Sequence, residues 1–319
     1  ADMYRTLSRQ IRPLYRCHPF SGPTAASLIC SVWSPRRISA ESTKSTGKEI
    51  PRTERKQNRC LRPEEEKHME EGKCMENHYK WERPVLQTDV PEINRAFELA
   101  LDDLAGNISP FQDGLLEKPA PVILAGNGYD TPWTRDAAIN VWNAAGLLMP
   151  EAARNTLLSV LTRDEGNIRA GGQYWDAVIW AVGAWHYWLC TGDRLFRDLS
   201  AEAIVNTLRY FEETEYDPGQ GLFRGPACYG DGVSAYPDRY AAGDSAILFY
   251  KDAFPERCVS RGYGIPMFTL STNCLYAEAY RLAWKLTGDP SWRTKAEQLS
   301  RTINRVFWNE RKGLYDYLM

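Results

Sequence analysis

A helical hairpin with the same three-residue turn occurs twice in this chain, and this repeat constrains the fold more than any other feature. The turn Thr-Gly-Asp stands at residues 191–193 and again at 287–289, 96 residues later. In each copy an apolar stretch precedes the turn and a more amphipathic stretch follows it, which predicts two antiparallel helices joined by a short loop. The predicted helices span about 174–190, 197–213, 269–286 and 291–307.

A third copy of the hairpin precedes these two. It has an apolar helix predicted at about 133–147, a turn at 148–150 and a second helix at about 151–163. A single hairpin cannot bury its apolar face, so repeated hairpins must pack against one another. A short apolar run at 119–125 favours a strand or an extended lead-in, but no longer alternating pattern competes with the helical one. We therefore expect an all-α fold built from helical hairpins.

The composition changes near residue 80, which predicts two parts of the chain. Residues 1–80 hold 16 Lys and Arg against 10 Asp and Glu, a net charge of +6, while the remainder holds 23 against 31, a net charge of −8. The charged run at 41–80 has few apolar residues and cannot bury enough surface to offset its ordering entropy. We expect 1–80 to be a disordered or foreign basic segment. The ordered domain should occupy 90–319 and begin with an amphipathic helix from Pro91.

The charge and motif content of the whole chain narrow its possible partners. A net charge of −2 gives no reason to expect nucleic acid, and no apolar run is long enough to span a membrane. No phosphate-binding glycine loop, nucleophile elbow or metal-ligand cluster appears in the sequence, so no cofactor is predicted. The eight cysteines form no C-x-x-C pair, so zinc-ligand spacing is absent. Cys190 and Cys274 lie in apolar helical runs, where they are expected to be small buried residues, and this favours a reducing compartment. We expect a cytoplasmic location, although residues 1–40 resemble a transit peptide in composition.

The stretch from Gly128 to Asp136 reads Gly-Tyr-Asp-Thr-Pro-Trp-Thr-Arg-Asp and brings an aromatic ring, a cation and a carboxylate to the start of the first apolar helix. Thr131 and Pro132 predict that start, with threonine as the N-cap and proline in the first helical position. The helix that follows is apolar on most faces and is therefore predicted to be buried. Arg135 and Asp136 would lie at its mouth, where they could either meet a ligand or simply cap the helix.

The loops before the other two apolar helices carry similar residues. Tyr174, Trp175 and Asp176 open the second helix, and Asn273 lies in the first turn of the third. Together with Trp133, they place aromatic rings beside carboxylate and amide groups at equivalent positions. Sugar rings stack on aromatic faces while their hydroxyls bond to carboxylates and amides, so this combination suits a carbohydrate ligand. Tryptophans within the helix interiors are expected to pack the core instead.

A long connection from about 214 to 268 is rich in Gly, Tyr and Asp. Loops of this length inside a compact domain are usually functional or disordered. Asp231 lies between two glycines and is the carboxylate best placed to project into a cleft. A turn aspartate is equally consistent with that setting.

The segment Pro-Trp-Thr-Arg-Asp at 132–136, with the repeated hairpins behind it, is similar to the Trp-Thr-Arg-Asp stretch of the six-hairpin glycosidases. These (α/α)6-toroid glycoside hydrolases include glucoamylases, trehalases and the processing glucosidases of glycoside hydrolase family 63. The resemblance implies an inverting, exo-acting hydrolase of the α-glucosidase type that acts on an oligosaccharide or glycoside. It also implies that Arg135 and Asp136 bind the sugar on the non-reducing side of the cleaved bond, with Trp133 beside them.

The same resemblance implies candidates for catalysis. The family places its general acid in the loop after the second hairpin, which makes Asp231 the candidate acid and Asp176 its rival. Tyr174, Trp175 and Asn273 are the further predicted substrate contacts. The resemblance covers about 90–319, so we expect only about half of the (α/α)6 toroid. The family's general base comes from later hairpins and has no counterpart here, which predicts an inactive fragment.

Two other functions remain open on the sequence alone. One is an (α/α)6 sugar epimerase or polysaccharide lyase, a class that relies on His or Tyr as acid and base. The chain contains only four His, three of them in the segment 1–80, which makes this function less favoured. The other is a non-catalytic helical-repeat module that binds carbohydrate.

Overall fold

The structure is a computed structural model, and within the described part of the chain it is mostly helical. It describes residues 79, 81–126, 128–172, 174–229, 236–237, 240 and 250–319. The predicted basic segment 1–80, apart from Tyr79, lies outside the described residues, and so does the candidate acid Asp231.

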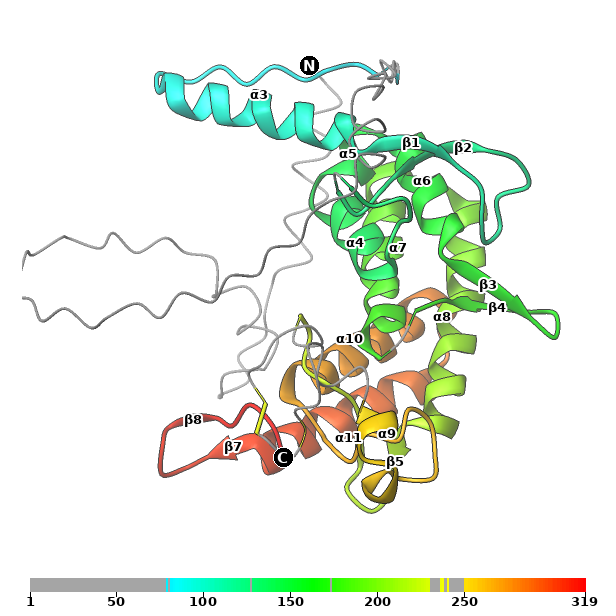
Figure 1. Cartoon of the computed structure of the whole chain (residues 1–319), viewed down its shortest axis with the longest axis vertical. Helices are drawn as coiled ribbons and strands as arrows, with labels where there is room; N and C mark the ends of the chain where they lie inside the picture. The colour runs from blue at the N-terminus through cyan, green and yellow to red at the C-terminus, as the bar shows by residue number, and fades with distance from the viewer. Residues whose placement is uncertain are drawn as a thin grey trace, which may run out of the picture. The chain divides into compact units, whose positions relative to one another are not determined.

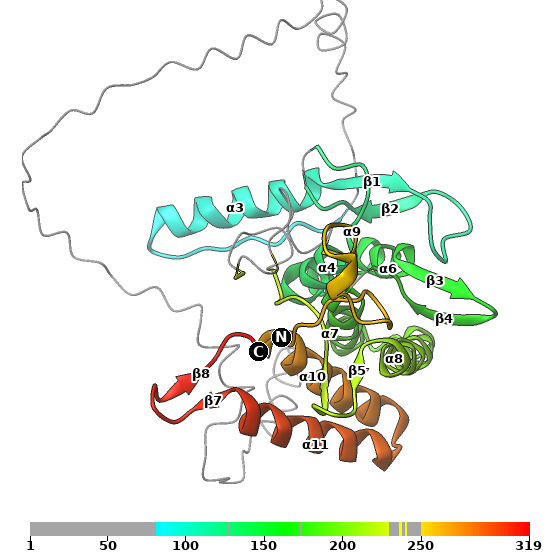
Figure 2. The same cartoon turned by 60° about the horizontal axis from the view of Figure 1, so that its bottom comes forward.

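The two hairpins with the Thr-Gly-Asp turn form as predicted (Figure 1). Each consists of an apolar inner helix followed by a more polar outer helix. The first pair is α7 (Trp175–Thr191) with α8 (Arg194–Thr214), and the second is α10 (Leu270–Thr287) with α11 (Pro290–Phe307). The helices of the second pair lie side by side along their length (Figure 2).

The Thr-Gly-Asp turn works in the same way in both copies. The glycine adopts a left-handed backbone, with φ of 68° at Gly192 and 75° at Gly288, and so ends the inner helix. The aspartate then caps the outer helix. Asp193 accepts a hydrogen bond from the backbone N–H of Phe196 at 3.0 Å, and Asp289 accepts one from the backbone N–H of Ser291 at 2.8 Å.

The first hairpin differs from its prediction at the start of its first helix and at the end of its second, which stops at Ser159 because Leu161–Asp164 form a strand. Its inner side is a contiguous run of three helical segments, and its outer helix returns after a short turn. These are α4 (Thr134–Asn140), the π-helical η4 (Val141–Ala145), α5 (Gly146–Leu148) and α6 (Pro150–Ser159). The predicted N-cap at Thr131 is wrong, because the helix begins at Thr134 with Trp133 as its extended N-cap residue. Pro132 favours an extended backbone in the residue before it and so delays the helix.

The described residues also contain four two-stranded antiparallel sheets, which the sequence did not predict beyond the apolar run at 119–125. Each sheet follows a helix and turns the chain back. The first follows the predicted amphipathic helix α3 (Pro91–Gly106), and the Gly-Leu-aromatic elements form strands β6 and β8. The strands are β1 (Ile108–Phe111), β2 (Ala120–Ile123), β3 (Leu161–Asp164), β4 (Asn167–Ala170), β5 (Tyr216–Asp217), β6 (Leu222–Phe223), β7 (Trp308–Asn309) and β8 (Leu314–Tyr315). Two short helices, α9 (Tyr250–Ala253) and η6 (Pro255–Arg257), lie in the long connection.

Helix α7 is central to the packing, because it contacts α4, α8 and α10. Its closest approach to α4 occurs at Gly183, where a Cβ atom would lie only 2.7 Å from the Cα atom of Ala138. The buried ring of Trp180 links α7 to α6, because its indole N–H donates to the carbonyl of Leu157 at 3.0 Å. This packing brings the first turns of α4 and α7 together.

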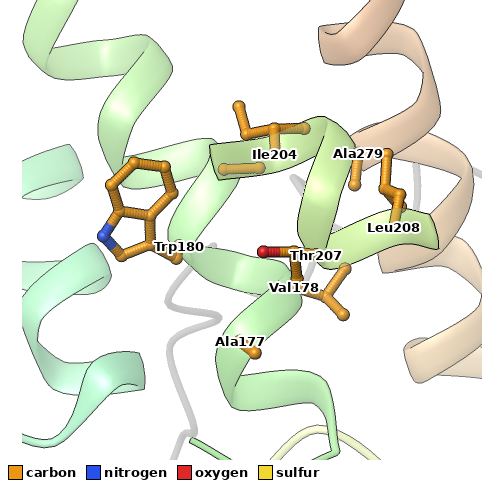
Figure 3. Close-up of a pocket in the computed structure, with 8 residues that line it drawn as sticks. Ala177, Val178, Trp180, Ile204, Thr207, Leu208 and Ala279 are labelled. Atoms are coloured by element: carbon orange, nitrogen blue, oxygen red, sulfur yellow. The ribbon is translucent and has the colours of Figure 1, made fainter. Parts of the chain in front are cut away.

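A small void lies where α7, α8 and α10 meet (Figure 3). Its volume is about 10 Å³, which is room for about one water molecule. Thr207 is the polar residue of its lining, and the Thr207 hydroxyl already donates to the carbonyl of Ala203 at 2.7 Å and accepts from the N–H of Ala170 at 2.9 Å. The void is therefore a gap in core packing and not a ligand site.

Candidate functional site

Arg135 joins the first turns of α4 and α7. Its Nη1 atom donates to Oδ2 of Asp176 at 2.8 Å, and its Nε atom lies 3.6 Å from the carboxylate of Asp136. The carbon centre of the guanidinium lies 4.8 Å from the centroid of the Trp133 ring. One cation therefore links an aromatic ring and two carboxylates that were predicted from the sequence as site residues.

These four side chains form a gradient from the interior to the surface. The Asp176 side chain is only 3% exposed, that of Arg135 is 24% exposed and that of Asp136 is 34% exposed. Trp133 is 41% exposed as a whole residue. A ligand at this surface would meet the indole ring and the Asp136 carboxylate first. Charged groups in such a setting form stronger hydrogen bonds than neutral groups do.

Gly172 allows the loop before α7 to cross directly over both first turns. Its φ of 93° lies in a region that residues with a side chain rarely adopt. A Cβ atom at Gly172 would lie 3.0 Å from the Thr134 hydroxyl oxygen and 3.1 Å from Cβ of Asp176. The close fit at this glycine therefore helps to position Asp176 beside α4.

Tyr174 and Trp175 lie behind this cluster and are buried, at 5% and 1% exposure. The ring centroid of Tyr174 lies 4.4 Å from that of Tyr263, and the centroid of Trp175 lies 4.8 Å from that of Tyr229. Both rings therefore support loops that reach the first turn of α7. The substrate contacts predicted for Tyr174 and Trp175 stay predictions.

Asn273 has a different role from the one predicted. It is fully buried, and both N–H groups of its amide are donated to backbone carbonyls, those of Phe223 and Thr269, each at 2.9 Å. Its carbonyl oxygen accepts the N–H of Phe223 at 2.8 Å. Asn273 thus fixes strand β6 to the first turn of α10 and has no amide proton left for a sugar. The predicted substrate contact at Asn273 is therefore corrected to a structural clasp.

Glu215, at the end of α8, is a buried carboxyl that the sequence did not single out. It accepts the backbone N–H of Tyr263 at 2.7 Å and so holds the loop whose tyrosine ring packs on Tyr174. Burial raises the pKa of Glu215 to about 7, against the opposing effects of the Tyr263 hydrogen bond and the charges of Arg224 and Arg261. Nothing in the sequence distinguishes Glu215 from its acidic neighbours, because only the folded loop buries it.

The described residues contain no group of three or more His, Cys, Asp and Glu side chains that could hold a metal ion. Among the same residues, no helix combines the length and apolarity needed to cross a bilayer. The candidate acid Asp231 lies outside this part of the chain, so its position relative to Arg135 stays a prediction. In comparisons with known proteins, no family model and no curated protein matches the chain.

Proposed function

We propose that this protein is a carbohydrate-active enzyme, an inverting exo-acting glycoside hydrolase of the α-glucosidase type, whose saccharide site lies at the first turns of α4 and α7. The observation that carries this proposal is the Arg135–Asp176 ion pair, with Asp136 and Trp133 around the same guanidinium. A pyranose offers an apolar C–H face to an aromatic ring and a rim of hydroxyls to charged groups. The four side chains match that combination.

Each residue has a proposed role. Trp133 stacks on the sugar, Arg135 donates to its hydroxyls, and Asp136 accepts from them. Asp176 is buried and paired with Arg135, so its proposed role is to orient the guanidinium. The general acid is assigned to Asp231, with Asp176 as its rival. An inverting enzyme also needs a second carboxylate, about 6.5–9.5 Å from the acid, to activate water, and none is assigned here.

We propose that the three hairpins are part of an (α/α)6 toroid in which α4, α7 and α10 are inner helices. In support, α7 contacts both of its neighbours in this series, and each inner helix is followed by an outer one. The first turns of the inner helices would then lie at one end of the ring, where a substrate can reach them.

The proposal is tested first by binding, because no residue is assigned as the general base. The full chain is titrated with maltose, trehalose and p-nitrophenyl α-D-glucopyranoside by calorimetry and by tryptophan fluorescence. We expect binding to at least one of them, weakened about tenfold or more by Arg135→Ala and by Asp136→Asn, which is a loss of at least about 1.4 kcal/mol. Asp164→Asn is the matched control, because Asp164 is an exposed aspartate that also pairs with an arginine, Arg169 at 3.4 Å.

Hydrolysis separates the alternatives. Release of p-nitrophenol that disappears in Asp231→Asn supports the hydrolase with its assigned acid. Sugar binding that depends on Asp136 without any turnover favours a non-catalytic carbohydrate-binding module, and epimerised sugar products favour an epimerase. A correctly folded chain that binds none of the three probes contradicts the proposed site.

A further inference from the structure

Tyr229 is a second exposed aromatic residue close to the proposed site, and the sequence did not single it out. The residue is 61% exposed, yet its ring is supported from below by the buried Trp175, with 4.8 Å between the ring centroids. The exposed part of the Tyr229 side chain is therefore accessible to a partner outside the fold.

The chain before Tyr229 is held firmly, so the position of this ring is not left to a free loop. Each of the four preceding residues, 225–228, is hydrogen-bonded to another part of the chain. The bonds are Gly225 N–H to the Met267 carbonyl (2.9 Å), the Thr269 hydroxyl to the Gly225 carbonyl (3.1 Å), the Thr272 hydroxyl to the Pro226 carbonyl, Ala227 N–H to the Tyr236 hydroxyl (3.0 Å) and Cys228 N–H to the Ser271 hydroxyl (3.0 Å). Most of these partners lie in or just before the first turn of α10.

The backbone of Tyr229 itself is unusual. Its φ of 61° is in the left-handed region, which is uncommon for a residue with a bulky side chain. Glycine or asparagine would adopt this conformation at a lower cost. Such conformations persist where the surrounding structure enforces them, and they are concentrated at ligand-binding sites.

The ring of Tyr229 lies within electrostatic reach of the proposed site. Partial burial raises the pKa of its hydroxyl, and the nearby Cys228 and the charge of Asp136 raise it further. The buried indole N–H of Trp175, on which the ring rests, has no hydrogen-bond partner in the described part of the chain.

We infer that Tyr229 is a specificity-determining residue of the saccharide site, an aromatic platform that stacks on the C–H face of a neutral pyranose whose hydroxyls are bound by Asp136. This inference rests on the proposed function and adds a substrate contact to it. The ring of Tyr229 packs on Trp175, and the hydrogen bonds of residues 225–228 fix the backbone that leads to it. Tyr229 also precedes the candidate acid Asp231 by two residues in the sequence.

The experiment compares ring, bulk and hydroxyl at residue 229 in the full chain. Tyr229→Phe keeps the ring, Tyr229→Leu keeps apolar bulk on Trp175 without a ring face, and Tyr229→Ala removes both. Maltose and trehalose are titrated by calorimetry, with tryptophan fluorescence as a second readout because Trp175 adjoins the mutated ring. We expect binding to weaken roughly five- to tenfold in the Leu and Ala variants and to stay within about twofold in the Phe variant. Tyr210→Ala, a 37% exposed tyrosine on the outer helix α8, should bind as the wild type does.

The outcomes separate the two proposals. If Asp136→Asn loses binding while Tyr229→Leu and Tyr229→Ala bind normally, the platform is overturned and the proposed function stands. If Tyr229→Phe loses as much as Tyr229→Leu, the hydroxyl and not the ring face makes the contact, which also overturns the platform. If the folded wild type binds neither sugar, the proposed function fails, and the assignment of Tyr229 fails with it.

Discussion

The outer helices of the two Thr-Gly-Asp hairpins begin in a different way from the inner helices, whereas the outer helix α6 has no side-chain cap. The outer helices α8 and α11 begin at local turns, where Asp193 and Asp289 accept backbone N–H groups two or three residues ahead. In the described residues, α4, α7 and α10 begin without a side-chain cap. Their first turns are held instead by contacts across 41 to 50 residues of sequence. The buried polar side chains Asp176 and Asn273 lie at two of these helix starts.

The inner helices α7 and α10 also differ from each other. In α7 the buried Asp176 is paired with a side chain, Arg135, which leads outward to exposed groups. In α10 the buried Asn273 is paired with the backbone of Phe223 and is sealed from solvent. A polar residue in the first turn of an inner helix is thus part of a surface cluster when its partner is a partly exposed side chain. It is a structural clasp when its partner is a buried backbone.

The largest expected effect is at this clasp. Asn273→Ala leaves the buried N–H and carbonyl of Phe223 without partners, since both bond to the Asn273 side chain. Each orphaned buried group costs about 1–3 kcal/mol, so we expect the free energy of unfolding to fall by about 3–4 kcal/mol in urea denaturation. Sugar binding by the remaining folded protein should be unchanged.

Asn206→Ala is the matched control for the clasp. Asn206 is half-buried on the outer helix α8, and its amide donates once to the backbone, to the carbonyl of Ile168 at 3.0 Å. Its loss should cost about 1 kcal/mol. Equal costs for the two asparagines, or a loss of sugar affinity in folded Asn273→Ala, would erase the distinction between the clasp and the site.

A second clasp, at Glu215, should make stability depend on pH. Burial raises its pKa from 4.5 to about 7 on folding, so the folded state holds this proton more tightly than the unfolded state does. This contribution is complete below pH 4.5 and is lost as the pH rises through 7, because burying the charged carboxylate then becomes necessary. The rise of about 2.5 in this pKa corresponds to a total change of roughly 3 kcal/mol.

Glu215→Gln tests this dependence. The glutamine can still accept the N–H of Tyr263 through its carbonyl oxygen, but it does not titrate. Urea unfolding between pH 4.5 and 8 should therefore show a flatter stability profile for the variant than for the wild type. Glu213→Gln, at an exposed neighbouring glutamate, should keep the wild-type profile. An unchanged profile in Glu215→Gln would show that the carboxyl group is not buried in solution.

The next largest loss of stability is expected where α4 and α7 cross. Gly183→Ala would place a Cβ atom 2.7 Å from Cα and 2.9 Å from the carbonyl oxygen of Ala138, so one helix backbone must shift. Overpacking of this kind costs about 1–3 kcal/mol, and the shift should also weaken sugar binding by moving Arg135 relative to Asp176. Gly106→Ala, in α3, has nothing within 4 Å of the new methyl group and should be neutral or slightly stabilising. Similar melting temperatures for the two variants would contradict the close crossing.

The comparison also explains which features the sequence could predict. The hairpins α7–α8 and α10–α11 were predictable because the signals of the Thr-Gly-Asp turn are local: a left-handed glycine and a capping aspartate. The β-hairpins were not, because strands of two to four residues are too short to show an alternating period.

At the candidate site, too, the sequence could identify the local motif but not the long-range contacts. The Trp133–Asp136 stretch was recognisable as a motif, and the structure brings three of its side chains together with Asp176. Asn273 could not be told from Asp176, since both are polar residues in a helical first turn and their partners lie far away in the sequence. The burial of Glu215 and the supported ring of Tyr229 likewise depend on loops that only the tertiary structure places.

The smallest expected effects lie at the local caps of the outer helices. Asp193→Ala removes the hydrogen bond accepted from the Phe196 N–H and the 3.4 Å ion pair with the partly exposed Arg154, and the loss should be about 1 kcal/mol, as is usual for an N-cap. Asp289→Ala removes the equivalent bond of α11, and its loss should be no larger. The hydrogen bond from the Ser291 N–H lowers the pKa of Asp289, so its contribution is present above the unfolded pKa and fades as the pH falls. Neither variant should alter sugar binding, because both caps lie at the Thr-Gly-Asp turns, which follow the C-terminal ends of α7 and α10 and so lie a helix length from the inner helix starts. A stability loss as large as that of Asn273→Ala would mean that the outer starts, too, depend on distant packing, and the contrast between local and long-range helix starts would no longer hold.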